Sequence, residues 1–525
     1  MKTKPAFGGA WCASLRALRS AVLMFFGLVA VPCPAQVVIN EIMYHPSDDA
    51  YDSEYVELYN TGSTSVDLSL YRFDDGIDFA FLPGTTLGAG DYIVVCANPT
   101  DFGQVYPGVT GQVGPYSGKL SNGGESLRLS RRDGSLWRTE DELTYNDRGI
   151  WPRTADGDGP SMELIHPGFP NQYGGAWSAA AGLGTPGAPN SVYQSDPAPL
   201  ITAVNHDPPL PFGNAPVTIT ALAAGHNTNP LTVTLRHRRD SNPPGSYTSV
   251  QMLDDGLHGD GAAGDEVFGA TVPGLPAGAL LDFQISATDA NGPQQTAPAA
   301  APGHTFLCYF GTDPDYTGEY RTYHILMTAA NRALLESRDV SSDVLLDGTL
   351  VLSDGRIFYN CGIRYRGSSS RHLTPKSFRV ELPLGQRLEG SDDINLNAVN
   401  PILQHLGMDL FRRLGVPTPR TEICRTWLNE TFLTQTAEPW MTGPAGGVYC
   451  RVEKLDGDFV DAYYQGDSAD GNLYRGTGGK LDWLGSSQST YENLYTKESN
   501  QTDSDWQDIV DLLDVFNNTP LPANP

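Results

Sequence analysis

The stretch best equipped for chemistry is a Gly/Ser turn followed by a lysine. Gly367, Ser368, Ser369 and Ser370 form the turn between two expected strands, and Lys376 opens the second strand. Backbone N–H groups and hydroxyls in such a turn bind phosphate oxygens, and a nearby lysine adds positive charge. The layout predicts a phosphate site. The alternative is the basic tip of a hairpin, because this stretch contains neither GxGxxG nor GxxxxGK[ST].

A second candidate is an Asp/Gly-rich stretch at residues 254–265. Asp254, Asp255, Asp260 and Asp265 alternate with glycines that let the loop fold tightly. Carboxylate oxygens in a flexible loop suit Ca²⁺, although the terminal Glu of an EF-hand is missing. We predict a calcium loop. The alternative is an Asp/Gly turn whose side chains cap its own backbone.

The charge balance limits the partners. The 525 residues carry 34 basic and 61 acidic side chains, a net charge of −27. This excess of acid argues against nucleic acid or an anionic membrane as a direct partner.

Two hydrolase motifs are missing from the sequence. HExxH and GxSxG are absent, which argues against a zinc protease or an α/β-hydrolase. A glycosidase with paired carboxylates stays open, because acidic residues are so numerous.

The N-terminus has the pattern of an export signal. Basic residues precede an apolar run from Ala21 to Val31, which is too short to span a bilayer. We expect residues 1–35 to be a signal peptide cleaved after Ala35, with an uncleaved anchor as the alternative. The protein is then secreted to the extracellular space or cell surface, with no membrane span after cleavage. The sequence leaves the oligomeric state open.

Five cysteines follow the signal, at widely spaced positions: Cys96, Cys308, Cys361, Cys424 and Cys450. Export permits disulfides, but the number is odd and the spacing sparse. We interpret them as buried free thiols. If one disulfide forms, Cys424 with Cys450 is the best candidate.

Residues 37–193 alternate short apolar segments with Gly, Asp and Asn turns, which predicts a β-sandwich. The segments resemble a lamin-tail domain at these positions: Asn40–Ile42, Glu54–Asn60, Asp67–Leu68, Gly88–Tyr92, Trp151–Pro152, Ala155–Gly159, Trp177, Gly184–Gly187 and Asn190. The resemblance implies an Ig-like adhesion or targeting module. Glu41 and Glu57 are one conceivable catalytic pair. We interpret them instead as solvated or turn-bonding carboxylates on strand edges.

Residues 196–308 have the period-2 pattern of a second Ig- or fibronectin-like β-sandwich, and they contain the Asp/Gly loop. From residue 310 to residue 525 the pattern changes to α+β. Helices are expected at 329–338 and at 402–414. The second helix places apolar residues at 402, 403, 406, 410, 411 and 414, and Gly415 ends it.

This last region resembles the spore-coat protein H (CotH) kinase family. The resemblance rests on the following segments: Ile363–Arg371, Pro375–Val380, Asn395–Ala398, Asp409–Arg420, Trp427–Asn429, Gly447–Tyr449, Val452–Lys454 and Gly471–Gly476. It implies a divergent protein-kinase fold and an ATP- and Mg²⁺-dependent, secreted Ser/Thr kinase. The resemblance implies that Gly367–Ser370 covers the phosphates and that Lys376 attracts them. Asp409 stands where the family often has a Glu, and we expect it to orient the lysine; Glu453 is expected to border the adenine pocket.

The chain departs from the family pattern in two places. Residues 433–446 look like an insertion, and after Asn472 nothing matches the family's catalytic Asp or metal-binding Asp; residues 503–508 read as a helix start. We therefore expect a truncated, partial kinase-like domain that is inactive in these 525 residues, inside a longer kinase docked by its β-domains. The alternative is a non-catalytic adhesion protein that binds an extracellular protein or surface polymer.

Overall fold

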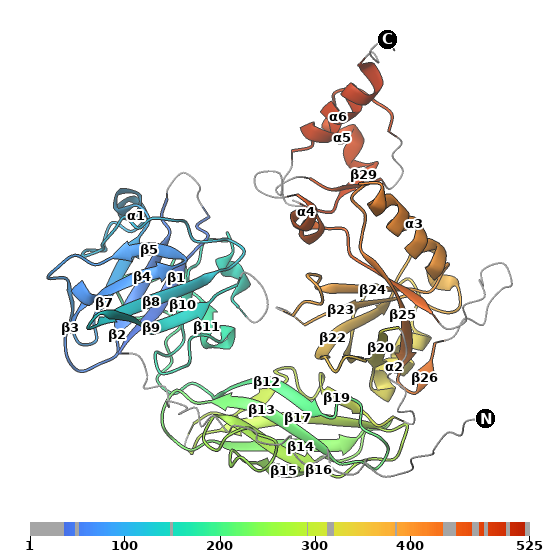
Figure 1. The fold of residues 1–525 in the computed structure, drawn as a ribbon, viewed down its shortest axis with the longest axis horizontal. Helices are drawn as coiled ribbons and strands as arrows, with labels where there is room; N and C mark the ends of the chain where they lie inside the picture. Colours follow the sequence, from blue (N-terminus) through green and yellow to red (C-terminus); the bar gives the residue numbers. More distant parts are fainter. Residues whose placement is uncertain are drawn as a thin grey trace, which may run out of the picture. The chain divides into compact units, whose positions relative to one another are not determined.

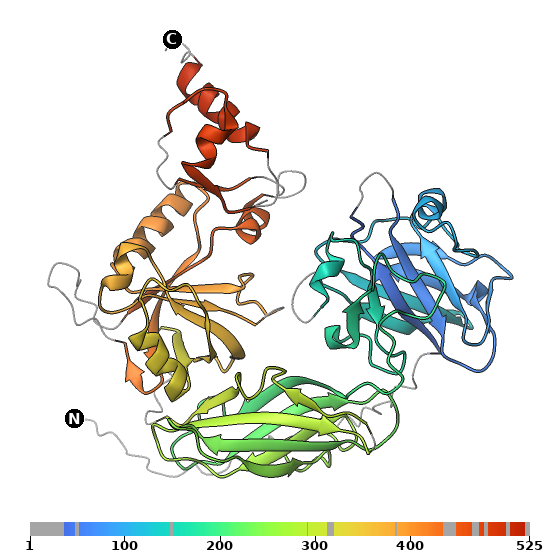
Figure 2. The same cartoon turned by 180° about the vertical axis from the view of Figure 1, so that it is seen from behind.

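The computed structural model describes residues 36–47, 52–146, 151–290, 292–311, 320–383, 386–433, 448–464, 472–476, 481–499 and 505–519. The predicted signal peptide lies outside the described residues, as does nearly all of the predicted insertion at 433–446. Figures 1 and 2 show three successive β-rich regions along the chain. In the described part, no helix is long and apolar enough to cross a bilayer.

The first region contains two main sheets. One has the strand order β11-β10-β1-β2-β7, and the other has the order β5-β4-β8-β9. The first sheet consists of β1 (Val37–Met43), β2 (Tyr55–Asn60), β7 (Tyr92–Cys96), β10 (Met162–Leu164) and β11 (Trp177–Ala179). The second consists of β4 (Tyr71–Asp75), β5 (Ile77–Ala80), β8 (Ser126–Asp133) and β9 (Leu136–Thr144). The remaining elements are β3 (Val66–Asp67), β6 (Thr86–Leu87), α1 (Pro99–Val105), η1 (Leu68–Leu70), η2 (Arg153–Ala155) and η3 (Gly174–Ala176).

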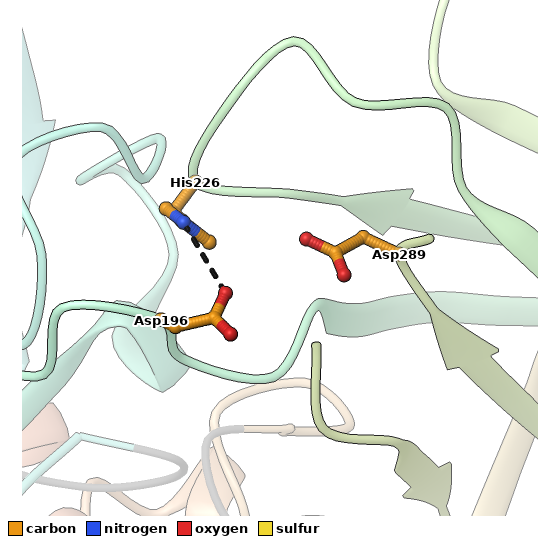
Figure 3. A group of neighbouring side chains, drawn as sticks. All are labelled: Asp196, His226 and Asp289. Carbon is orange, nitrogen blue, oxygen red and sulfur yellow. Dashed lines mark ion pairs between the residues drawn. The ribbon is translucent and has the colours of Figure 1, made fainter. Parts of the chain in front are cut away.

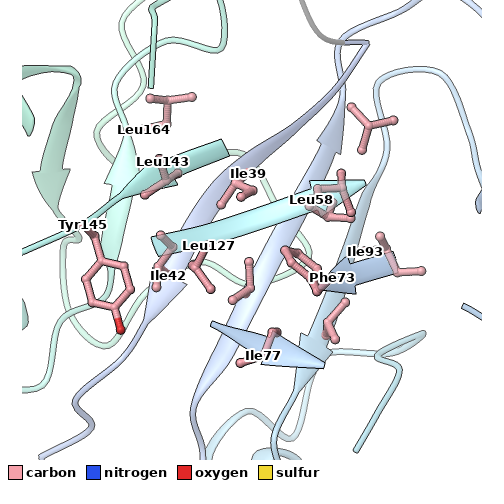
Figure 4. Close-up of a cluster of buried hydrophobic side chains, with 14 of the residues drawn as sticks. Ile39, Ile42, Leu58, Phe73, Ile77, Ile93, Leu127, Leu143, Tyr145 and Leu164 are labelled. Atoms are coloured by element: carbon pink, nitrogen blue, oxygen red, sulfur yellow. The ribbon is translucent and has the colours of Figure 1, made fainter. Parts of the chain in front are cut away.

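Both sheets of this region contribute side chains to one core. Ile39 and Leu58 come from the first sheet, and Phe73 and Leu127 from the second; all four are fully buried in one cluster (Figure 4). Alternation along each strand brings every second residue to this side. The core therefore forms where the period-2 pattern predicts it.

The second region is also built from two sheets. The first has the order β12-β13-β16: β12 (Leu200–Asp207), β13 (Val217–Ala224) and β16 (Val267–Val272). The second has the order β15-β14-β17-β18, with β19 also paired to β17: β14 (Thr232–Arg239), β15 (Thr248–Met252), β17 (Leu280–Thr288), β18 (Gln295–Ala297) and β19 (Phe306–Tyr309). Ile219, Leu235 and Phe283 are buried in one cluster, to which both sheets contribute side chains.

The third region contains an eight-stranded sheet that closes on itself. Its order is β20-β21-β22-β23-β24-β27-β25-β26, and a parallel pairing of β20 with β25 completes the ring. The strands are β20 (Thr322–Leu326), β21 (Leu346–Leu352), β22 (Ile357–Tyr365), β23 (Phe378–Glu381), β24 (Asp393–Asn397), β25 (Thr421–Leu428), β26 (Thr431–Phe432) and β27 (Tyr449–Val452). Ile363, Val380 and Leu396 are fully buried in its core. The predicted kinase-like α+β arrangement stays a prediction.

Short helices and one further two-stranded sheet, formed by β28 and β29, complete the third region. They are α2 (Ala329–Ser337), η4 (Ser369–His372), α3 (Pro401–Arg413), α4 (Gly457–Tyr463), β28 (Tyr474–Gly476), α5 (Gln488–Glu492), β29 (Tyr495–Lys497) and α6 (Gln507–Asn518). The expected helices at 329–338 and 402–414 correspond to α2 and α3. The apolar face predicted for α3 is not in the core, because Leu403, Leu410 and Phe411 are more than half exposed.

All five described cysteines are buried free thiols, as interpreted from their spacing. Cys424 and Cys450 lie on paired strands, but the register sets Ile423, not Cys424, opposite Cys450. Neighbouring residues on a strand point to opposite faces. This register therefore separates the two sulfur atoms of the best disulfide candidate.

Candidate functional site

A cleft of about 810 Å³ lies on the third region, between the closed sheet, α3 and the β28 segment. Six cationic side chains line it: Arg364, Arg366, Arg371, Arg379, Lys454 and Arg475. Only two carboxylates, Glu453 and Glu498, share the described lining. The cleft is thus strongly basic in a protein whose overall charge is −27. A basic cleft concentrates anionic ligands.

Strand register builds the floor of this cleft. Arg364 on β22 stands opposite Arg379 on β23, which stands opposite Asn395 on β24. Asn395 in turn faces Val452 on β27. Directly paired residues share a face of the sheet, so these four side chains form one row across four strands. The row places two guanidinium groups side by side.

Most of the lining cations have an acidic partner. The Arg379 Nε lies 2.6 Å from a carboxylate oxygen of Asp393, which is buried, and the Lys454 Nζ lies 2.8 Å from the other oxygen. Asp343 similarly serves two arginines, at 2.8 Å from Arg364 and 2.6 Å from Arg371. These pairs hold the basic side chains in place.

Arg366 is the exception. Its guanidinium donates to the Asn397 side-chain oxygen and has no carboxylate partner among the described residues. Burial, together with the positive charges of Arg364 and Arg379, lowers the pKa of Arg366 to about 10. Arg366 is half-buried, and a cation that is partly withdrawn from water without a counter-ion favours an anionic ligand, since such a ligand would neutralise it.

The predicted phosphate turn borders this cleft in part. Gly367 and Ser368 belong to the lining, and the turn continues into η4. Gly367 has φ +111, and a Cβ there would lie 2.1 Å from the Ser370 Oγ, so the position requires glycine.

The other predicted nucleotide residues are placed differently. The Lys376 Nζ donates to the Arg371 carbonyl oxygen at 2.6 Å, and Lys376 is not in the lining. Asp409 accepts from the Arg413 Nε at 2.7 Å, so the expected Lys376–Asp409 ion pair does not form. Asp409 and Arg413 are four residues apart on α3, which places them on one face of the helix. Glu453 lines the cleft and is held by Arg420 through the Arg420 side chain and backbone N–H.

The described lining does not fit a Mg²⁺ ion. Mg²⁺ binds through carboxylates, usually with several waters. Glu453 is engaged by Arg420, and Glu498 lies 2.9 Å from the Arg475 guanidinium. Each of these two carboxylates is therefore already paired with an arginine.

The arginines are what sequence reasoning missed at this site. Arg364 and Arg366 are two residues apart, and Arg379 follows on the neighbouring strand. A two-residue spacing near a strand end indicates side chains on one face, so the signal was present in the sequence. The pairing of Arg364 with Arg379 depends on strand register, which the sequence by itself does not reveal.

The predicted calcium loop connects β15 to β16. Asp260 is buried, and its two oxygens accept from the backbone N–H groups of Asp255, Gly256 and His258 at 2.7–2.9 Å. Asp254 accepts from the Gly264 and Glu266 backbones, and Asp265 from Ala262 and Val267. These are the contacts that the alternative interpretation, a self-capping turn, requires.

Glu41 and Glu57 belong to a row of buried carboxylates. Glu41 on β1 pairs with Glu57 on β2 and with Glu163 on β10, and all three are fully buried. The expectation that the first two are solvated was wrong. The expectation of turn bonding is correct, because Glu41 accepts from the Thr185 N–H at 2.9 Å and Glu57 from the Gly187 N–H at 2.5 Å. The pairing of β10 with β1 covers the edge where solvent would enter.

Three stretches of the chain match family models. Residues 31–147 match the lamin tail domain, residues 232–294 match the second Ig-like domain of conditioned medium factor, and residues 363–524 match the CotH kinase protein family. No curated protein matches.

The similar solved structures are distant. A cycloalternan-forming enzyme from Listeria monocytogenes shares 13% identity over 35% of this chain, with a TM-score of 0.15; the match spans 14% of that enzyme's length. Spo0M, a sporulation control protein from Bacillus subtilis, shares 10% identity over 38% of this chain and 74% of its own, with a TM-score of 0.15. Purple acid phosphatase PPD1 from yellow lupin shares 10% identity over 56% of this chain and 44% of its own, with a TM-score of 0.20. These scores support no argument about fold or function.

The three family matches fall in the order in which the sequence motifs occur, and the basic cleft lies within the last of them. The domain composition of the chain is therefore a lamin tail domain, an Ig-like domain and a CotH kinase domain.

Proposed function

We propose that the basic cleft of the CotH domain binds the phosphate groups of ATP. The observation that carries this proposal is Arg366, a half-buried guanidinium at the cleft without a carboxylate partner among the described residues. Arginine presents a planar set of donors that matches phosphate oxygens in pairs. Arg364 and Arg379 beside it supply further positive charge.

The apolar part of the lining, which includes Val452 at the end of the arginine row, forms a wall that suits a nucleobase. Met408, Val452 and Leu455 are apolar lining residues. Ligand sites typically combine such an apolar surface with a few polar groups that fix orientation. The adenine ring then lies against this wall, and the phosphates extend toward Arg366 and the Gly367–Ser368 turn.

Isothermal titration with ATP, with and without Mg²⁺, tests this assignment. We expect Arg366→Ala to raise the Kd at least tenfold, since a charge-assisted hydrogen bond contributes about 1.5–3 kcal/mol. Lys376→Ala is expected to have a smaller effect, because Lys376 lies outside the lining. Arg356→Ala is the matched control, as this exposed arginine pairs with Asp354 away from the cleft. Equal affinity for all variants would refute the assignment.

We further propose that the 525 residues bind ATP without transferring its γ-phosphoryl group, because nothing after Asn472 matches the catalytic Asp or the metal-binding Asp that the CotH kinase resemblance implies. A radiolabelled-ATP transfer assay on a generic protein acceptor tests this expectation separately from ATP binding. ATP binding without label on the acceptor supports it. Label on the acceptor that disappears in Arg366→Ala would overturn it and show a kinase.

We propose a surface-binding role for the two β-domains of an exported protein. The hairpin of β8 and β9 carries the exposed Leu136 and Trp137, and the Arg72 guanidinium lies 4.0 Å from the Trp137 ring centroid. Exposed aromatic residues are common in polymer and protein contacts. Co-sedimentation with insoluble glycans, comparing the parent with Trp137→Ala, tests this proposal. The proposal is contradicted if the parent does not co-sediment with the glycans, or if Trp137→Ala co-sediments as much as the parent does.

A further inference from the structure

One end of the Ig-like sandwich brings together three side chains that can bind a metal ion. Asp196 precedes β12, His226 follows β13, and Asp289 follows β17 (Figure 3). The strand register explains the convergence, because Leu200 pairs with Ala224 and Thr232 pairs with Thr288. Three segments thus deliver one imidazole and two carboxylates to the same place.

The spacing of their ligand atoms fits a divalent ion better than a hydrogen bond. One ligand atom from each residue lies within 4.8 Å of the other two. The His226 Nε2 and an Asp196 oxygen are 3.7 Å apart, which is beyond hydrogen-bond range. Two ligands of a tetrahedral zinc ion, each at about 2.0–2.2 Å from it, lie roughly 3.3–3.6 Å apart. Small side-chain rotations therefore complete the arrangement.

Two of the three groups are held in a buried setting. The His226 side chain and Asp289 are each only 8% exposed, whereas Asp196 faces solvent. Asp289 accepts from the Gly292 backbone N–H, and the His226 ring contacts the ring of His166 at a centroid distance of 4.6 Å. Preorganised ligands lose little conformational entropy when an ion binds.

Asn227 is the group that competes with an ion. Its side-chain nitrogen lies 2.8 Å from the His226 Nε2 and 3.4 Å from an Asp289 oxygen. It thus bridges two of the three ligands. The amide must turn away before His226 and Asp289 bind the same ion, so Asn227 opposes binding.

We propose that Asp196, His226 and Asp289 bind a divalent transition-metal ion of the Zn²⁺ type, with water completing the coordination. Imidazole with carboxylate is a usual ligand set for zinc, whereas Ca²⁺ and Mg²⁺ prefer oxygen ligands alone. The ion joins the segment before β12 to two loops of the sandwich. It therefore stabilises this end of the Ig-like domain.

Zinc titration of the full chain after EDTA treatment and dialysis tests the proposal. We expect one site by calorimetry and a higher Tm with Zn²⁺ than with EDTA. His226→Ala and Asp196→Asn are each expected to weaken binding at least tenfold. Asp196→Asn is the variant most certain to fold, because Asp196 is exposed. Asn227→Ala is expected to bind zinc as tightly as the parent or more tightly, since it removes the competing amide.

His45→Ala is the matched control. His45 forms an ordinary ion pair with Asp156 at 2.7 Å in the lamin tail domain, and among the residues that the structure describes it belongs to no such three-residue group. Its zinc affinity should equal that of the parent. The proposal is overturned if the parent shows no zinc-dependent Tm rise, or if Asp196→Asn and His226→Ala bind zinc as the parent does.

Discussion

Glu41, Glu57 and Glu163 stand opposite one another on three neighbouring strands of the lamin tail domain. The Glu41 Oε1 accepts from the hydroxyls of Tyr55 and Ser161 and from the Thr185 N–H, while its Oε2 is buried without a hydrogen-bond partner. Burial raises the pKa of both Glu41 and Glu57, and the proximity of other carboxylates raises it further. These side chains retain protons in the folded state at a pH where the unfolded chain has released them.

This difference makes the domain less stable at higher pH. The unfolded carboxyls titrate near 4.5, so above that pH the folded state binds more protons and unfolding releases them. The stability that these two protonated carboxyls contribute is fully present below pH 4.5. It is expected to fall by several kcal/mol, roughly 3 or more, as the pH rises to 8. Hydrogen–deuterium exchange of β1 and β2 peptides, corrected for intrinsic rates, measures it.

Glu41→Gln identifies the group responsible. Glutamine resembles the protonated acid in shape and keeps one oxygen for the three donors, so the pH dependence should become weaker. Glu142→Gln, on the exposed strand β9 of the same domain, should leave it unchanged. Protection that rises with pH in the parent would show that the carboxylates are ionised in the fold.

At the scale of the element, the β15–β16 loop is held by its own acidic side chains. Asp260→Ala leaves three N–H groups without their acceptor and is expected to destabilise the Ig-like domain by about 2–3 kcal/mol. Asp265→Ala should have a smaller effect, because Asp265 is exposed. Thermal unfolding in calcium-free buffer measures both. If Asp260→Ala instead costs stability only when Ca²⁺ is present, the loop is a calcium site.

Helix α3 presents an apolar face to solvent. Leu403 and Leu410 are more than half exposed, and leucine substitutions at exposed positions usually change stability by less than 0.5 kcal/mol. The double variant Leu403→Gln/Leu410→Gln should therefore keep the parent Tm. Leu396→Ala, in the core strand β24, is expected to lose about 2–5 kcal/mol. A large loss in the double variant would mean that this face is covered in solution.

At the scale of the whole molecule, three domain types follow a predicted export signal. We expect protein recovered from the medium of an exporting host to begin at Gln36. N-terminal sequencing or intact mass measures this directly. Ala35→Lys places a large charged residue at the position before the cut and should prevent processing. A secreted product that retains Met1 would contradict the predicted cleavage.

Sequence alone determined the local features of this protein. Alternation predicted its β-rich regions, and spaced apolar residues with Gly415 predicted α3 within one residue at each end. The motifs also indicated the three domain types that the family models match. These features were readable because strand and helix preferences depend on residues within a few positions of one another.

Tertiary structure decided which distant residues meet. Ser161 bonds Glu41 across 120 positions, Arg364 pairs with Arg379 across a turn, and the β20–β25 pairing closes the third sheet. Each contact depends on strand register, and a slip of one residue would turn every side chain to the other face. Register is set by the packing of whole sheets. For that reason the buried carboxylates, the pairing of Arg364 with Arg379 and the Asp196–His226–Asp289 group emerged only in the folded chain.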